Sequence, residues 1–211
     1  MIGRLHVLTD FLFQQRFSHA ELARLAVEGG ADTLQFRQKR GTVRSLLAGL
    51  GPAVEVCREA GVPLIVDDHL ALALAVGADG VHLGQLDLPI GAARAVLARC
   101  GGPTRIVGAT ATTAEAARAA EAAGADYIGF GPVFATRSKA NPASVKGLEG
   151  LATACRAVGV PVVAIGGLTP ERVRPALEAG AHGVAVMTAV TTAPDPRAAT
   201  ARFREALEQR A

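Results

Sequence analysis

A short pattern recurs six times along this chain and constrains its fold more than any other feature. Each copy ends an alanine- or leucine-rich stretch with glycine and leads at once into an apolar run; the copies are Glu28–Asp32, Glu59–Pro63, Ala75–Asp79, Ala122–Asp126, Ala157–Pro161 and Glu178–His182. Glycine is the residue that most often takes the left-handed conformation at which helices end. The pattern therefore predicts helices that each turn tightly into a strand.

Strand-like and helix-like stretches alternate along the whole chain. The predicted strands are Leu5–Thr9, Thr33–Arg37, Leu64–Asp67, Gly80–Gly84, Arg105–Ala109, Tyr127–Gly131, Val162–Gly166 and Gly183–Met187. The predicted helices are Ala20–Glu28, Arg44–Ala60, Leu70–Val76, Ile90–Ala98, Ala114–Ala123, Leu148–Val158, Pro170–Ala179 and Asp195–Gln209. The strands are mostly apolar rather than alternating, which is typical of parallel strands covered by helices.

Eight such units in 211 residues favour an α/β chain folded as one TIM (β/α)8 barrel over residues 1–211. A doubly wound open sheet is the alternative. No linker rich in glycine, serine and proline divides the chain, and half of its residues are hydrophobic, enough for a large core.

Composition excludes several classes of function. The net charge of +3 comes without a dense basic run, which argues against nucleic-acid binding. Three cysteines, Cys57, Cys100 and Cys155, show no CxxC spacing, as expected of a reduced chain. No apolar run approaches the roughly 18 residues of a membrane helix, and the first residues leave no room for a signal peptide. We expect a cytoplasmic protein; homo-oligomerisation is left open.

The barrel hypothesis sorts the polar residues by position. In this fold the chemistry lies where strands end. Those ends read Thr9-Asp10, Gln35 to Lys39, Asp67-Asp68, Gly84 to Asp87, Ala109-Thr110, Gly131 to Lys139, Gly166-Gly167 and Met187-Thr188. The opposite ends carry turn residues, so the sequence predicts one functional rim.

Cations and acids on this rim suggest a polyphosphate site. Side chains alternate along a strand, so Gln35, Arg37 and Lys39 share one face. Together with Lys139, the two cations suit a diphosphate, although solvated surface charges are the alternative. Asp68 and Asp87 suit Mg²⁺, which takes one or two carboxylates and completes its shell with water and phosphate oxygens. On a regular strand the neighbouring Asp67 diverges from Asp68.

Other rim residues have structural as well as functional interpretations. The glycines at 166 and 167 predict a phosphate site with Met187-Thr188, or a plain turn before a helix capped by Thr169. We expect Thr113 to cap a helix, leave Thr110 open, and interpret His82 as a hydrogen-bonded core imidazole.

Ordered motifs along nearly the whole chain resemble those of thiamine phosphate synthases. The matching segments are Gln35-Phe36-Arg37-Gln38-Lys39, Val66-Asp67-Asp68-His69, Gly77 to Pro89 and Gly131-Pro132-Val133-Phe134-Ala135-Thr136-Arg137-Ser138-Lys139. The resemblance implies a barrel enzyme that joins a hydroxymethylpyrimidine diphosphate to a thiazole phosphate and releases diphosphate.

The same resemblance implies roles for individual residues. Arg37, Lys39 and Lys139 would be catalytic and hold the diphosphate, and Gln35 would contact the pyrimidine. Asp68 and Asp87 would bind Mg²⁺. The thiazole phosphate would be seated by Thr136, Ser138, Gly167 and Thr188, and the further substrate-binding residues would be Gln38, Asp67, Thr110 and Met187.

The chain departs from the family pattern at several positions. Asp67 stands where the family usually has Asn, Gln38 where Glu is common, and Thr112 where relatives carry His. Two rival hypotheses remain: a barrel that isomerises the thiazole phosphate, and a non-catalytic phosphate-binding barrel. The first needs a proton-transfer group at position 112, and the second has no need for both Asp68 and Asp87.

Overall fold

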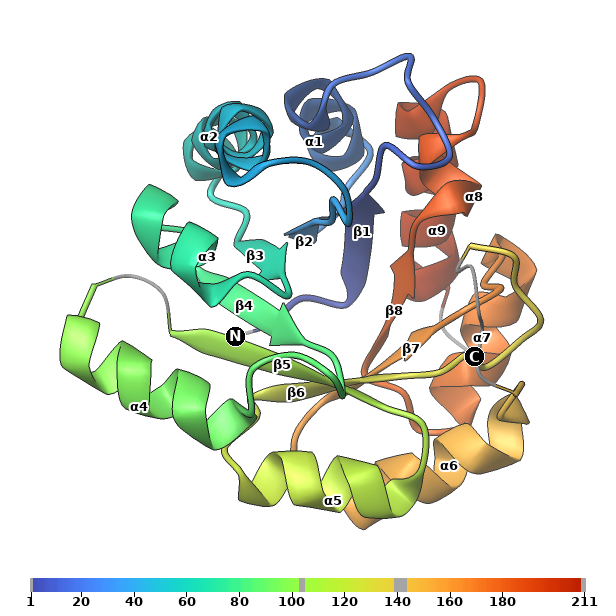
Figure 1. The fold of residues 1–211 in the computed structure, drawn as a ribbon. Helices are drawn as coiled ribbons and strands as arrows, with labels where there is room; N and C mark the ends of the chain where they lie inside the picture. The colour runs from blue at the N-terminus through green and yellow to red at the C-terminus, as the bar shows by residue number, and fades with distance from the viewer. Residues whose placement is uncertain (1, 103–104, 139–143, 210–211) are drawn as a thin grey trace.

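The computed structural model describes residues 2–102, 105–138 and 144–209. Within them, parallel strands close into one barrel surrounded by helices (Figure 1). The strands are β1 (Leu5–Thr9), β2 (Thr33–Phe36), β3 (Leu64–Asp67), β4 (Gly80–Leu83), β5 (Ile106–Ala111), β6 (Tyr127–Phe130), β7 (Val162–Ile165) and β8 (Gly183–Val186). The predicted TIM barrel is confirmed, and the open sheet is excluded because β1 pairs with both β2 and β8.

The helices follow the strands in the predicted order. They are α1 (His19–Glu28), α2 (Val43–Ala60), α3 (Leu70–Val76), α4 (Ile90–Cys100), α5 (Ala114–Ala122), α6 (Gly147–Ala157), α7 (Pro170–Glu178), α8 (Thr188–Thr191) and α9 (Pro196–Glu208). Helix α8 was not predicted, because its four residues are too few to show a helical period.

Glycine ends the helices largely as the recurring pattern predicted. Gly61 and Gly77 both have a φ of +66° and close α2 and α3 in the left-handed conformation. The prediction is wrong at Gly159. Helix α6 ends at Ala157, and the next residue, Val158, has an extended backbone, so Gly159 does not close the helix. There the Gly159 amide instead donates a hydrogen bond of 2.7 Å to the Glu121 carboxylate.

Three aspartates of the recurring pattern join neighbouring strands at the amino end of the barrel. Each carboxylate precedes one strand and accepts a hydrogen bond from the backbone of the strand before it. The three bonds run from Leu5 N to Asp32 Oδ1 (2.7 Å), from Leu64 N to Asp79 Oδ2 (2.9 Å) and from Val107 N to Asp126 Oδ2 (2.7 Å). These acids therefore satisfy backbone donors that the sheet leaves unpaired.

Two apolar clusters hold the fold together. The larger lies between the strands and the helices. The smaller lies inside the barrel and comprises Ile2, Leu8, Tyr127, Val163 and Ala185. Because Ile2 and Tyr127 stand at the amino end, this cluster forms a floor, which we call the barrel floor. None of the helices in the described ranges has both the length and the apolar character needed to cross a bilayer.

Candidate active site

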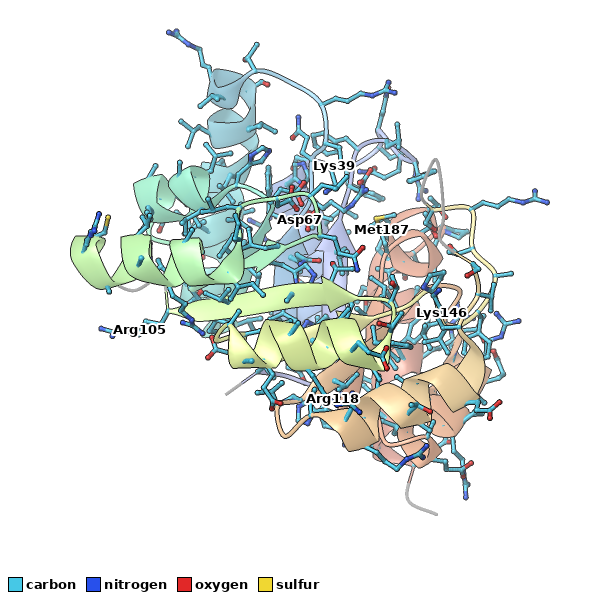
Figure 2. The ribbon with its side chains drawn as sticks, turned by 60° about the horizontal axis from the view of Figure 1, so that its bottom comes forward. Lys39, Asp67, Arg105, Arg118, Lys146 and Met187 are labelled. Atoms are coloured by element: carbon cyan, nitrogen blue, oxygen red, sulfur yellow. The ribbon has the colours of Figure 1, made fainter. Side chains whose placement is uncertain are left out.

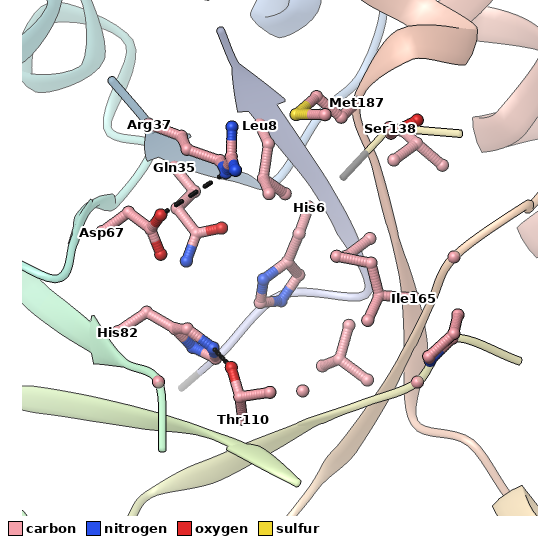
Figure 3. A pocket seen from close by; sticks show the side chains of 18 of the residues that line it. His6, Leu8, Gln35, Arg37, Asp67, His82, Thr110, Ser138, Ile165 and Met187 are labelled. Carbon is pink, nitrogen blue, oxygen red and sulfur yellow. Dashed lines mark hydrogen bonds and ion pairs between the residues drawn. The ribbon is translucent and has the colours of Figure 1, made fainter. Parts of the chain in front are cut away.

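A cavity of about 700 Å³ opens at the carboxyl ends of the strands, the end we call the rim (Figure 3). A volume of this order suits a small-molecule ligand. Its lining includes the predicted residues Gln35, Arg37, Lys39, Asp67, Asp68, Asp87, Thr110, Thr136, Ser138, Gly167, Met187 and Thr188. The structure thus brings these twelve together, whereas Lys139 lies outside the described residues.

The end of β2 carries the polar side chains that alternation predicted to share a face. Gln35 is buried inside the barrel, and Arg37 and Lys39 lie above it at the rim. Arg37 forms an ion pair with Asp10, a carboxylate that is 1% exposed and that also accepts a hydrogen bond of 2.5 Å from Leu12 N. Asp10 supplies the partner that a buried guanidinium requires.

From the sequence, Asp10 was placed at the end of the first strand but given no role. Its position after that strand could have indicated a place in the site, because side chains that follow neighbouring parallel strands meet at one rim. Recognising the pair with Arg37 required the pairing of β1 with β2, which sets Thr9 beside Phe36.

Lys39 lies between two adjacent acids. Its Nζ is 2.9 Å from Asp67 Oδ2 and forms a second ion pair with Asp68, while Arg37 Nε is 3.6 Å from the same Asp67 oxygen (Figure 2). Burial alone would lower the pKa of Lys39, but the carboxylates of Asp67 and Asp68 outweigh it and hold the pKa above its ordinary value.

The expectation that Asp67 and Asp68 diverge is wrong. Asp68 has a φ of +63°, which is left-handed, so the regular strand ends at Asp67 and the next side chain turns back toward the same cation. Aspartate tolerates this conformation better than most residues. Strained backbone of this kind is often found at functional sites.

Asp68 and Asp87 provide two acids that could hold a cation. Burial first, and then a hydrogen bond with Asp68, raises the pKa of Asp87. Two carboxyl groups in contact disfavour each other's charge unless a proton or a cation neutralises them. The described residues contain no cluster of three or more histidine, cysteine or acidic side chains suited to a metal. The pair therefore fits Mg²⁺ only with further oxygen ligands from water or substrate.

The loop after β4 is shaped to hold Asp87. Gly84 N donates a hydrogen bond of 2.7 Å to Asp87 Oδ2, and a Cβ at position 84 would lie only 2.8 Å from that oxygen. Glycine at 84 thus permits the close approach of backbone and acid.

Hydroxyl groups and a glycine turn lie across the cavity from these charges. Ser138 Oγ is 2.7 Å from Thr188 Oγ1 and accepts a hydrogen bond of 3.2 Å from Thr136 Oγ1. Gly167 has a φ of +64°, and its carbonyl accepts a hydrogen bond of 2.6 Å from Arg172 Nη1. Side chains from the loops after β6 and β8 therefore meet at one edge of the cavity, as predicted.

Gln38, which was predicted to bind substrate, is not among the described residues that line the cavity. Its Oε1 is 3.0 Å from His19 Nε2, and its Nε2 donates to the Arg40 carbonyl at 3.0 Å. His19 also lies 2.6 Å from Thr9 Oγ1. Gln38 therefore ties the loop after β2 to α1, on the face opposite Arg37 and Lys39.

Of the two threonines considered as helix caps, one caps its helix with a side-chain hydrogen bond and the other does not. Thr113 caps α5 by accepting a hydrogen bond of 3.1 Å from Ala116 N, as predicted. Thr169 occupies the N-cap position of α7, but its side chain makes no capping hydrogen bond.

Polar side chains also lie deep in the cavity. His82 Nδ1 is 3.0 Å from Tyr127 Oη, and His82 Nε2 is 2.9 Å from Thr110 Oγ1. Burial lowers the pKa of His82 and raises that of Tyr127, so both groups are neutral. The hypothesis that His82 is a hydrogen-bonded core imidazole is confirmed. The sequence analysis did not single out Tyr127 or His6, which also lines the cavity.

These features define a class: a (β/α)8 barrel with a small-molecule site at its rim, where paired acids and cations face a hydroxyl- and glycine-rich edge. Comparisons with known proteins then identify the family. Residues 7–190 match the family model described as thiamine monophosphate synthase. The chain belongs to this family.

Individual relatives agree with the family model. The thiamine-phosphate synthase of Salinibacter ruber is 61% identical over 98% of this chain and 89% of its own length. That of Moorella thermoacetica is 48% identical over 88% of this chain and 86% of its length. The solved thiamine phosphate pyrophosphorylase from Pyrococcus furiosus superposes with a TM-score of 0.86 at 39% identity, covering 97% of this chain and 95% of that one.

Proposed function

We propose that this chain joins a hydroxymethylpyrimidine diphosphate to a thiazole phosphate, giving thiamine phosphate and diphosphate. The observation that carries the proposal is the meeting of Arg37, Lys39, Asp68 and Asp87 at one mouth of the barrel, opposite Ser138 and Thr188. In this proposal the two groups of residues bind the two phosphorylated substrates separately. The names of the relatives support the same reaction.

The bonds that break and form in this reaction indicate a role for each part of the site. The C–O bond between the pyrimidine methylene and the diphosphate breaks, and the lone pair of the thiazole nitrogen forms the new C–N bond. Negative charge grows on the departing diphosphate, where Arg37 and Lys39 stabilise it. Lys139, by the resemblance, would add a third cation.

The remaining residues position the reactants. Gln35, buried below Arg37, contacts the pyrimidine in this proposal, and Thr136, Ser138, Gly167 and Thr188 seat the thiazole phosphate. Holding two reactants in a reactive geometry replaces much of the entropy cost of their encounter.

Asp68 and Asp87 would hold Mg²⁺, which would supply charge neutralisation to the diphosphate. Burial and then the neighbouring Asp68 raise the pKa of Asp87, and both acids line the same cavity, which supports this assignment. The same acid pair disfavours the two rival functions, because neither isomerisation of a thiazole phosphate nor passive phosphate binding requires it. A cytoplasmic location remains a prediction from the sequence.

The test is direct. Purified protein is mixed with Mg²⁺ and both substrates, and thiamine phosphate is measured by mass spectrometry together with released diphosphate. Parallel reactions omit one substrate or contain EDTA. We expect product only with both substrates and the cation. A folded protein that forms no thiamine phosphate would contradict the proposed reaction, and full activity in EDTA would contradict only the metal assignment.

A further inference from the structure

Three neighbouring strands place a chain of hydrogen bonds in the depth of the cavity, and the proposed reaction assigns no work to its buried part. His82 Nε2 on β4 lies 2.9 Å from Thr110 Oγ1 on β5 (Figure 3). On its other side, His82 Nδ1 lies 3.0 Å from Tyr127 Oη on β6. Tyr127 and His82 are 2% and 8% exposed, whereas Thr110 is half-buried and lines the cavity. The chain therefore runs from a buried phenol to a hydroxyl that a ligand can reach.

The burial of Tyr127 fixes the direction of this chain. A neutral imidazole donates through one nitrogen and accepts through the other. If His82 Nδ1 carried the hydrogen, it would donate to Tyr127 Oη, and the phenol hydrogen would need another acceptor. In the part of the chain that the structure describes, His82 is the only hydrogen-bond partner of the Tyr127 hydroxyl. A buried donor without an acceptor is costly, whereas an exposed hydroxyl is satisfied by water.

The lower-energy arrangement follows from this difference. Tyr127 donates to His82 Nδ1, and the hydrogen on Nε2 is donated to Thr110 Oγ1. The Thr110 hydroxyl then has its own hydrogen left to donate into the cavity. The opposite arrangement leaves Tyr127 with the unsatisfied donor.

Two glycines show that the backbone makes room for this arrangement. A Cβ at Gly108 would lie 2.2 Å from Tyr127 Cζ and 2.5 Å from His82 Nδ1. A Cβ at Gly129 would lie 3.0 Å from His82 Cε1. A side chain at position 108 would displace both rings, and one at position 129 would press on the His82 ring, so the packing of three strands fixes the positions of His82 and Tyr127.

We propose that Tyr127 and His82 are positioning residues that orient the Thr110 hydroxyl as a hydrogen-bond donor to the bound ligand. The inference rests on the proposed function for the identity of that ligand, the pyrimidine diphosphate. The ligand atom that faces Thr110 is then an acceptor, a ring nitrogen or a diphosphate oxygen. A ligand that presented an amino group there would place donor against donor and bind more weakly.

The first experiment measures the tautomer of His82 without any substrate. The full chain carrying ¹⁵N-labelled histidine is studied by long-range ¹H–¹⁵N NMR at neutral pH, with His82 assigned through its contact with Thr110. We expect the hydrogen on Nε2. A hydrogen on Nδ1, or on both nitrogens, would overturn the proposal. This result needs no variant and no activity, so it stands apart from the test of the proposed function.

The second experiment asks whether Tyr127 acts through Thr110. Tyr127→Phe keeps the ring but removes the donor, and Thr110→Val removes the final hydroxyl. We expect Tyr127→Phe to lower kcat/KM for the pyrimidine diphosphate about tenfold, the value of one good hydrogen bond. KM for the thiazole phosphate should not change.

A double-mutant cycle separates this role from a merely structural one. In the Thr110→Val background, Tyr127→Phe should cause little further loss, because the two substitutions interrupt the same chain. Equal losses in both backgrounds would contradict the proposal. Thr110→Ser, which keeps the hydroxyl, should recover part of the activity that Thr110→Val loses, and Tyr127→Phe should again cause a loss in the Thr110→Ser background. Melting temperatures confirm that each variant is folded.

Discussion

The two ends of the barrel use acidic side chains in opposite ways. At the amino end, Asp32, Asp79 and Asp126 each accept a backbone hydrogen bond from a neighbouring strand, and Asp32 also pairs with Arg204 at 2.7 Å. At the rim, Asp67 and Asp68 share Lys39. The first arrangement satisfies the backbone, and the second leaves charges beside an open cavity.

This difference explains how one fold can be both stable and reactive. The three acids at the amino end join neighbouring strands and so contribute to folding, whereas Asp87 accepts its backbone hydrogen bond within the rim loop that holds it beside the cavity. Acids that are close to each other, as Asp68 and Asp87 are, gain from a cation that neutralises them. The comparison predicts that substitutions at the amino end change stability, whereas substitutions at the rim change turnover.

The largest effect is expected at Asp87. Asp87→Ala removes one of the two acids assigned to Mg²⁺, and turnover should fall at least about 100-fold, equivalent to about 3 kcal/mol of transition-state stabilisation. The melting temperature should hold, because the change also relieves the repulsion from Asp68. Steady-state kinetics at several Mg²⁺ concentrations, with a thermal melt on the same sample, test this. Activity near wild type would refute the role of the rim acids.

A second effect concerns a buried imidazole behind the rim. Burial lowers the pKa of His19 from 6.5 to about 4, so the unfolded chain binds a proton in this range that the folded chain does not. The stability that comes from the neutral ring is therefore complete above about pH 6.5 and is lost as the pH falls toward 4, by up to about 3 kcal/mol.

Urea unfolding between pH 4 and 7 measures this dependence. His19→Gln should flatten the curve relative to wild type. The other buried imidazole with a pKa lowered to about 4, His6, stays in both proteins and accounts for a remaining slope. Identical slopes in the two proteins would show that His19 does not contribute.

A smaller loss of stability is expected at the amino end. Asp79→Ala leaves the Leu64 amide without the acceptor that now lies 2.9 Å away, and the free energy of unfolding should fall by about 1–3 kcal/mol. Kinetic constants per folded molecule should not change. If turnover fell as much as in Asp87→Ala, the inference that the acids at the amino end serve stability and those at the rim serve turnover would be wrong.

The smallest effect is expected at Asp67, where this chain departs from its family. Asp67→Asn removes an anion 2.9 Å from the Lys39 ammonium and frees that cation for the diphosphate. Binding of the pyrimidine diphosphate should tighten a few-fold, about 0.5–1 kcal/mol, as expected for a partly exposed ion pair. Calorimetric titration measures the change; weaker binding would mean that Asp67 is needed to hold Lys39 in place.

Much of the fold and part of the site followed from local patterns. The glycine-ended helices and apolar runs located every strand of the barrel, since both signals depend on a few adjacent residues. The shared face of Gln35, Arg37 and Lys39 was predicted for the same reason: alternation along a strand is a local property. The sorting of polar residues onto the rim followed from the fold itself.

The predictions failed where the outcome depends on distant parts of the chain or on a single dihedral angle. Gln38 turns away from the cavity because its partner, His19, lies on α1. Asp68 turns toward Lys39 because of its left-handed φ, which no periodicity reveals. The role of His82 as a hydrogen-bonded core imidazole was predicted, but its partners Thr110 and Tyr127 were not, because only the pairing of three strands in the barrel brings these groups together.

The barrel floor has a consequence for how ligands enter and leave the cavity. Ile2 and Tyr127 lie at the amino end of the barrel, below the cavity that opens at the rim. In the part of the chain that the structure describes, the floor is apolar and the polar groups lie above it. We therefore expect ligands to enter from the rim, so that the molecule bound deepest arrives before, and leaves after, a molecule bound above it.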